Sequence, residues 1–133
     1  MRILGINSLN HDAAIAMIEE GEILFAGHEE RYSNIKFDEH LNDKLFTDCL
    51  QYGKPDKVVF FERPWLKKTR QLYAGQNNEA FNVRNIPRFY LKDYIDKAKI
   101  EYVQHHTSHA AAGYFTSPYD EAVIVVIDAI GEW

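Results

Sequence analysis

The sequence predicts an α/β protein built on a mixed β-sheet, with its elements in the order β-β-β-α-β-α-β. The chain opens with three short apolar segments separated by polar turns. A segment with helical spacing of its apolar residues follows. Two unbroken, β-branched runs then have the composition of strands buried on both faces, at residues 57–61 and 122–127.

The three opening segments, residues 2–6, 13–18 and 23–28, are predicted to form an antiparallel meander. The loop after the first strand holds Asn7, His11 and Asp12. Two alanines follow this cluster, and their small side chains would let a ligand approach the backbone. On the sequence alone, His11 is either a ligand-binding residue or a structural turn histidine.

Residues 29–38 are polar and are predicted to form an irregular loop. Arg31 and Lys36 are its basic groups; they are either solvated or bind an anionic oxygen. A helix is expected over residues 41–50, with Gly53 as the C-cap residue just beyond its end.

The middle of the chain, residues 63–99, is predicted to hold two helices. Apolar residues between 65 and 73 indicate the first, and aromatic and aliphatic residues up to 98 indicate a second that begins after Pro87. Residues 76–78 and 82–85 are expected to be loops. A short strand at 100–103 then leads into a helix that ends before Pro118.

That last helix contains the most distinctive pattern of the chain. Three of the six histidines fall between residues 105 and 109, and His105 and His109 are spaced to share one face of a helix. Asp128 follows the apolar run 122–127, at the end of a predicted strand. Two imidazoles and one carboxylate are three ligands of the kind that hold Zn²⁺ or Fe²⁺ with positions left open. The alternative is that the histidines only cap or pack the helix start.

Length and composition limit the classes of function. A chain of 133 residues, 46% hydrophobic, is expected to form one globular domain. The net charge of −5 and the scattered 15 Lys and Arg argue against a nucleic-acid surface, and no apolar run is long enough to span a membrane. Cys49 is expected to be a core thiol, and the protein to be cytoplasmic.

The predicted order of elements is that of the ribonuclease-H-like half of actin-like ATPases and sugar kinases. Such folds pair two halves across a cleft, and this chain is expected to hold one half and the opening of the next. We therefore expect a fragment or a subunit whose second half is absent from residues 1–133.

Several blocks of the sequence, taken in order, resemble the N-terminal part of the O-carbamoyltransferases, which include nodulation and antibiotic-tailoring enzymes. The blocks are Gly5-Ile6-Asn7, His11-Asp12-Ala13-Ala14, Glu29-Glu30-Arg31-Tyr32, Ile35-Lys36, His105-His106-Thr107-Ser108-His109-Ala110-Ala111, Asp120-Glu121-Ala122 and Asp128-Ala129-Ile130-Gly131-Glu132-Trp133. The resemblance runs from end to end of the chain, except for the middle region. Many relatives have Gly where Ala129 stands, and His where Phe37 stands.

The resemblance implies a two-part enzyme. A YrdC-like domain, absent here, would make carbamoyladenylate from carbamoyl phosphate and ATP. The N-terminal part, similar to the tRNA threonylcarbamoyl-transfer proteins, would pass the carbamoyl group to a hydroxyl of a small acceptor. It further implies a metal, typically Fe²⁺, held by His105, His109, Asp128 and a later aspartate outside this chain.

Within that scheme, His11 is our candidate for the base that accepts the acceptor proton, with His106 in reserve. Lys36 is expected to stabilise negative charge. Asn7, Asp12 and Gly131 are expected to contact the nucleotide.

Three alternatives stay open. One is a tRNA threonylcarbamoyl-transfer protein, which shares the histidine pair, although a basic tRNA surface is missing. Another is a sugar or acetate kinase, which would hold Mg²⁺ through a carboxylate instead of a histidine pair. The third is a non-catalytic piece that needs a partner chain or a second copy of itself.

Overall fold

The computed structural model describes residues 1–10, 12–95 and 99–128. The chain divides into two compact units. Unit 1 comprises Met1–Phe60 and Val83–Glu101, and unit 2 comprises Phe61–Asn82 and Tyr102–Trp133.

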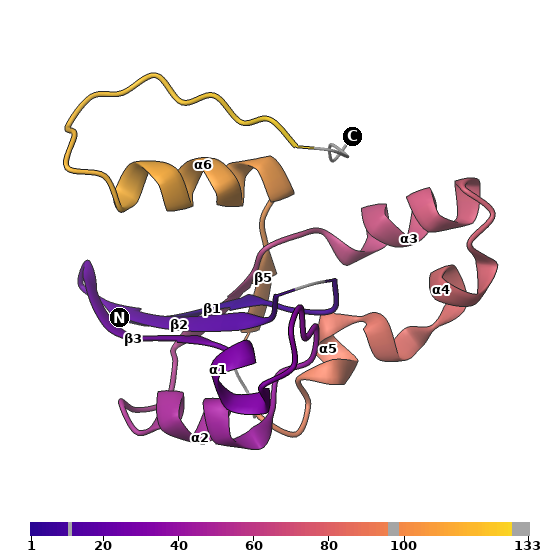
Figure 1. The fold of residues 1–133 in the computed structure, drawn as a ribbon, viewed down its shortest axis with the longest axis horizontal. Coiled ribbons are helices and arrows are strands. Elements are labelled where there is room, and N and C mark those ends of the chain that lie inside the picture. The colour runs from indigo at the N-terminus through magenta and orange to yellow at the C-terminus, as the bar shows by residue number, and fades with distance from the viewer. Residues whose placement is uncertain (11, 96–98, 129–133) are drawn as a thin grey trace. The chain divides into compact units, whose positions relative to one another are not determined.

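The antiparallel meander is confirmed in unit 1 (Figure 1). Strand β1 (Arg2–Asn7) pairs with β2 (Ala14–Glu19), which pairs with β3 (Glu22–His28). Glu20 and Gly21 form the tight turn between β2 and β3, and both have positive φ, as a two-residue hairpin requires. The apolar side chains that alternate along β1 and β2 lie on one face of the sheet and pack into the core.

Two further strands complete a five-stranded sheet in the order β3-β2-β1-β4-β5. Strand β4 (Lys57–Phe60) runs parallel to β1, and β5 (Lys99–Tyr102) lies beside β4. Because β1 has an antiparallel neighbour on one side and a parallel one on the other, the sheet is mixed. The predicted mixed α/β architecture is confirmed at this level.

Helix α2 (Asp43–Leu50) confirms the predicted amphipathic helix, although it begins two residues later than expected. The side chain of Asn42 caps it by accepting a hydrogen bond from the Leu45 N–H. Gln51 is the C-cap residue, so the predicted C-cap role of Gly53 is wrong by two positions. Gly53 has φ +112° in the turn that follows, where its N–H donates to the Leu50 carbonyl. Cys49 is fully buried in this helix, as expected for a core thiol.

Residues 29–38, predicted to be irregular, contain the single-turn helix α1 (Glu30–Ser33). Asn34 ends it in the left-handed conformation, and its N–H donates to the Glu30 carbonyl. Asn tolerates this conformation better than most residues, so the sequence held the signal for a helix end.

In the middle of the chain, α3 (Pro64–Tyr73) confirms the first predicted helix, but the loop expected at residues 76–78 is wrong. Helix α4 (Asn77–Phe81) lies there. The ammonium group of Lys68, a buried residue of α3, donates to the carbonyl oxygens of Glu79 and Asn82. A cation at the carboxyl end of a helix stabilises it through the exposed carbonyl groups, which local residue composition does not reveal.

The second predicted helix of this region, up to residue 98, is also wrong in length. After the 3₁₀ turn η1 (Val83–Asn85), where a loop was expected, α5 covers only Pro87–Tyr90. The aromatic residues beyond Pro87 serve a different purpose, because the Tyr94 ring stacks on Phe46 of α2 with the centroids 4.1 Å apart. The Tyr90 hydroxyl accepts a hydrogen bond from the Leu41 N–H. Residues 96–98 lie outside the described residues.

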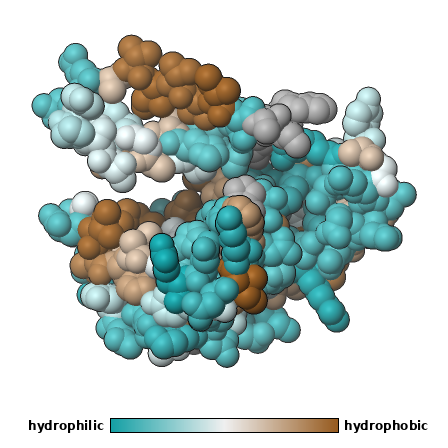
Figure 2. Space-filling model, viewed as in Figure 1, coloured by the Kyte–Doolittle hydropathy of each residue, from teal (hydrophilic) through white to brown (hydrophobic). Residues whose placement is uncertain are grey.

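Unit 2 contains the predicted histidine helix α6 (His105–Phe115), but the buried strand expected at residues 122–127 is wrong. The segment is extended yet unpaired with any strand in the described part of the chain. Val123, Val125 and Ile127 are 94%, 75% and 90% exposed and form a hydrophobic patch along the segment (Figure 2). A β-strand requires a neighbour for its backbone hydrogen bonds, and an apolar sequence alone does not provide one.

In the described residues, no helix combines the length and the hydropathy that crossing a bilayer requires.

Candidate metal centre

Helix α6 arranges two of its histidines on one face. Gln104 precedes the helix with extended backbone, and the alanine-rich sequence that follows favours the helical conformation. His105 and His109 are one turn apart, and their imidazole rings meet edge to face with the centroids 4.6 Å apart. Their Nε2 atoms are 3.2 Å apart, so both rings present the same nitrogen to a common point.

Asp128 joins this pair from the extended segment that follows α6. Its Oδ2 atom lies 2.8 Å from Nε2 of His105 and 4.0 Å from Nε2 of His109. Among the described residues, these three form the one group of histidines, cysteines and carboxylates arranged to hold a metal ion. The structure therefore brings together the three side chains that the sequence pattern singled out.

The donor set fits a first-row divalent metal. With metal–ligand bonds of about 2.1 Å, the ligand atoms of a tetrahedral site lie roughly 3.4 Å apart, and the three observed separations fall on either side of that value. Two imidazoles and one carboxylate suit Zn²⁺ or Fe²⁺ better than Mg²⁺ or Ca²⁺, which prefer oxygen ligands. The His109 side chain is 54% exposed, so a substrate has access from solvent.

His106, the reserve base, faces a different environment. Its ring centroid lies 6.0 Å from that of His105. Its Nε2 atom is buried and has no hydrogen-bond partner within the described part of the chain. The structure thus places His106 beside the histidine pair without giving it a contact to Asp128.

The first loop of unit 1 holds the other polar cluster predicted from the sequence. The Asn7 side-chain amide donates to the backbone carbonyl of Asp12 at 3.2 Å. The Asp12 carboxylate lies 3.8 Å from Nε2 of His28. Leu9 and Asp12 both have positive φ, a conformation that residues other than glycine adopt rarely. His11 lies outside the described residues.

Backbone hydrogen bonds hold this loop in place. The Leu9 N–H donates to the Glu39 carbonyl, and the Ala13 N–H donates to the Asp38 carbonyl. The Glu29 N–H donates in turn to the Ala13 carbonyl. The strained loop is therefore supported from both ends by the chain that follows β3.

The side chain of Glu29 adds a second level of support. It is fully buried, and its two oxygens accept hydrogen bonds from the backbone N–H and the side-chain amide of Asn42. Burial raises the pKa of this carboxyl group, because a charge is disfavoured away from water. Neither Glu29 nor Asn42 was predicted to be a site residue, since a buried carboxylate has no local sequence signal.

Lys36 and Gly131 complete the set of predicted residues. Lys36 is exposed in unit 1, with its Nζ atom 4.9 Å from the centroid of the Phe37 ring. Gly131 lies outside the described residues, as does Ala129.

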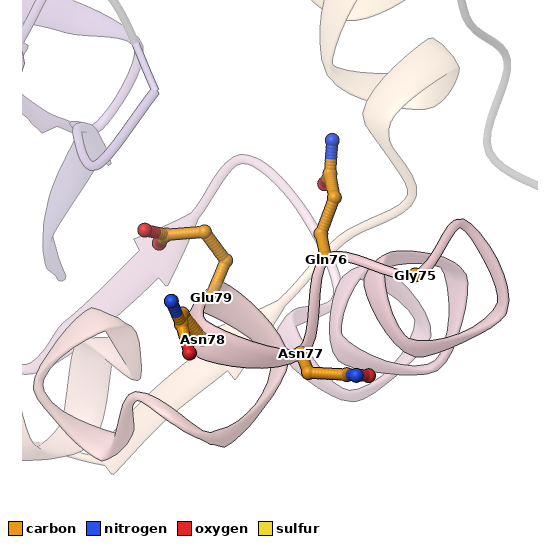
Figure 3. A pocket seen from close by; sticks show the side chains of 5 residues that line it. All are labelled: Gly75, Gln76, Asn77, Asn78 and Glu79. Carbon is orange, nitrogen blue, oxygen red and sulfur yellow. The ribbon is translucent and has the colours of Figure 1, made fainter.

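A shallow pocket of about 560 Å³ lies in unit 2, at the connection between α3 and α4 (Figure 3). Its lining residues are Gly75, Gln76, Asn77, Asn78 and Glu79. Figure 3 shows the side chains of Gln76, Asn77 and Glu79 pointing in different directions rather than toward one point. The pocket therefore lacks the convergent polar groups of a binding site.

Comparison with known proteins identifies the family. Residues 57–133, which include the three converging side chains, match the model of the carbamoyltransferase N-terminus. The chain belongs to the carbamoyltransferase family. The resemblance inferred from the sequence blocks is confirmed.

Similar sequences occur in distant organisms. The chain is 32% identical to an uncharacterised protein of Synechocystis, over 98% of this chain and 26% of that protein. It is 24% identical to the nodulation protein NolNO of Sinorhizobium fredii, over 96% of this chain and 21% of that protein. It is 28% identical to an uncharacterised protein of Methanocaldococcus jannaschii, over 98% of this chain and 22% of that protein. The chain thus spans about a quarter of the length of these relatives.

Two contacts of the carbamoyltransferase histidine pair were missed in the sequence. The Phe61 ring lies edge-on to the His105 ring, with the centroids 5.5 Å apart. The Ser108 hydroxyl lies within hydrogen-bond distance of the carbonyl oxygens of Phe61 and His105. The position of Ser108, three residues after His105 on a helix, is a signal that could have been used. Phe61 has no comparable signal, because 44 positions separate it from His105.

Proposed function

We propose that this carbamoyltransferase chain forms the metal-binding N-terminal part of an O-carbamoyltransferase, which transfers a carbamoyl group from carbamoyladenylate to an acceptor hydroxyl. The observation that carries the proposal is the convergence of His105, His109 and Asp128. We further propose that the mixed sheet belongs to a ribonuclease-H-like half of an actin-like ATPase fold, which the sheet order supports only in its general features.

His105, His109 and Asp128 would hold the metal, Fe²⁺ or Zn²⁺, and a further aspartate outside this chain would be a fourth ligand. When bound, the metal supplies Lewis-acid chemistry that neutralises phosphate charge and polarises the carbamoyl group. Oδ2 of Asp128 lies within hydrogen-bond distance of Nε2 of His105, at 2.8 Å, so these two side chains orient each other.

The transfer itself requires a general base and a cationic group that stabilises the developing negative charge. The acceptor oxygen forms a bond to the carbamoyl carbon, the bond from that carbon to the adenylate oxygen breaks, and AMP leaves with the electron pair. We assign the acceptor proton to His11, with His106 as the alternative base, and charge stabilisation to Lys36. Asn7, Asp12 and Gly131 are assigned to nucleotide binding.

The partners follow from the same scheme. A small molecule with a hydroxyl group is the acceptor, and a YrdC-like part makes carbamoyladenylate from ATP and carbamoyl phosphate. That part, or a second copy of the chain, would complete the site. The net charge of −5 supports a small acceptor rather than a nucleic acid.

The first test is metal binding by the purified chain. Titration with Zn²⁺, and with Fe²⁺ under anaerobic conditions, should give one ion per chain. His109→Ala and Asp128→Ala should each weaken binding more than tenfold. His40→Ala is the matched control, because His40 is an exposed histidine outside the cluster. Failure of the wild-type chain to bind either ion, or binding that survives both substitutions, would refute the proposal.

The second test is group transfer. The metal-loaded chain is incubated with ATP, ¹⁴C-labelled carbamoyl phosphate and a panel of polyhydroxylated acceptors, with and without a separately produced YrdC-like domain. We expect label in an acceptor only when that domain is present, and none with His109→Ala. Label that appears equally with His109→Ala would exclude a role of this site in transfer.

A further inference from the structure

Phe61 occupies a special position in the chain. It directly follows β4 and is the first residue of unit 2. It is half-buried, and it contacts the beginning of α6 through both its side chain and its backbone.

The side-chain contact involves His105. The two rings meet at 67°, with their centroids 5.5 Å apart, which is an edge-to-face arrangement. The His109 ring contacts His105 in a similar edge-to-face manner, at 80°. His105 therefore has an aromatic neighbour from its own helix and a second one from a distant part of the chain.

The backbone contact involves Ser108. Its hydroxyl lies 3.3 Å from the Phe61 carbonyl oxygen and 2.7 Å from the His105 carbonyl oxygen. The hydroxyl thus lies between the backbone of Phe61 and the first turn of α6. This contact keeps Phe61 next to the helix turn that bears His105.

We infer that Phe61 is a positioning residue for the metal centre, which holds the His105 ring in the orientation that directs Nε2 toward His109 and Asp128. The inference rests on the proposed function. A histidine side chain has two torsion angles. Its ring, in the first turn of a helix, adopts several rotamers unless neighbouring groups exclude them. Groups that orient a ligand without touching the metal typically change metal affinity by about 10- to 100-fold.

The phenyl ring has no polar atom and so contributes nothing to the donor set. Its substitution therefore tests orientation alone. Leucine is apolar but smaller and lacks the flat ring, whereas tyrosine keeps the ring. Phe115 is a matched aromatic control at the end of α6, the helix that bears His105. This residue is 81% exposed, and its ring packs on Tyr114.

The experiment measures the Co²⁺ and Zn²⁺ affinity of the full 133-residue chain, together with the visible absorption spectrum of the Co²⁺ form. Phe61→Leu should weaken binding about tenfold and change the intensity of the Co²⁺ bands, which report ligand geometry. Phe61→Tyr and Phe115→Leu should keep both values of the wild type. Helix content from circular dichroism accompanies each measurement, so that a change in the spectrum is compared between folded chains.

Ser108→Ala provides an independent variant, because it removes the hydroxyl contact with Phe61 and leaves every ring in place. It should weaken metal binding in the same direction as Phe61→Leu. Unchanged affinity and spectrum in both variants, or an equal loss with leucine and tyrosine, would overturn the inference. A wild-type chain that binds no metal would instead overturn the proposed function, so the two failures are distinguishable.

Discussion

The Oδ2 atom of Asp128 lies 2.8 Å from Nε2 of His105, although 23 positions separate the two residues in the chain. The contact brings a carboxylate from an extended segment to the first turn of α6. Without it, His105 and His109 would be a pair of imidazoles with no anionic ligand. The carboxylate turns a common helical pattern into a candidate metal centre.

Asp128→Asn tests the charge of this carboxylate. Asparagine has nearly the same shape but is a poor ligand for Zn²⁺ or Fe²⁺, so the metal dissociation constant should rise more than tenfold. Isothermal titration calorimetry measures the change. Asp120→Asn is the control, because Asp120 is exposed and lies outside the cluster. An affinity equal to that of the wild type would show that Asp128 is not a ligand.

Asn42→Ala should destabilise unit 1. The substitution removes the cap of α2, which typically contributes about 1 kcal/mol, and leaves a buried Glu29 oxygen without its amide donor, at about 1–3 kcal/mol. Urea unfolding should show a loss of about 2–4 kcal/mol in the free energy of unfolding. Gln51→Ala, at the exposed end of the same helix, should change it by less than about 0.5 kcal/mol. An equal loss of unfolding free energy in both variants would contradict a stabilising role of the hydrogen bonds between Glu29 and Asn42.

The thiol of Cys49 should make stability depend on pH in the alkaline range. Burial raises its pKa from 9.0 to about 11 in the folded chain. Above pH 9 the unfolded thiol ionises while the folded one stays neutral, so its contribution is complete below pH 9 and is lost as the pH rises to 11. A shift of two pKa units corresponds to about 2–3 kcal/mol.

The measurement compares the free energy of unfolding of the wild type and Cys49→Ala from pH 8 to pH 11. The wild type should lose more stability over this range, because alanine does not ionise and all other groups are shared. The folded thiol should also react slowly with iodoacetamide at pH 8, since it is fully buried. Parallel pH curves for the two proteins would argue against the raised pKa.

The exposed patch of Val123, Val125 and Ile127 should bind hydrophobic dyes and favour association of the isolated chain. Replacing Val125 with lysine should lower the fluorescence of bound 8-anilinonaphthalene-1-sulfonate and reduce association in analytical ultracentrifugation. Ile23→Lys changes a single exposed residue of β3 outside the patch and serves as the comparison. Equal fluorescence of the wild type and Val125→Lys would show that the patch is covered in solution.

Local patterns predicted those elements whose stability comes from neighbours in the sequence. The meander, α2, α3 and α6 all show the expected periodicity and lie close to where it placed them, although α2 begins two residues later. The helix α4 was missed because the group that stabilises its end, Lys68, belongs to a different helix. The helix predicted after Pro87 was too long. The apolar spacing that suggested it includes Tyr94, whose ring packs on Phe46 instead of along a helix face, and the sequence pattern does not distinguish these two cases.

The sequence by itself determined the two imidazoles of the candidate centre, since a spacing of four residues on a helix sets their separation whatever surrounds it. Only the tertiary structure decided that Asp128 meets them from an extended segment without strand pairing, and that Phe61 contacts His105. The physical reason is range. Hydrogen bonds within one helix depend on adjacent turns, whereas contacts across 23 or 44 positions depend on how the intervening chain packs.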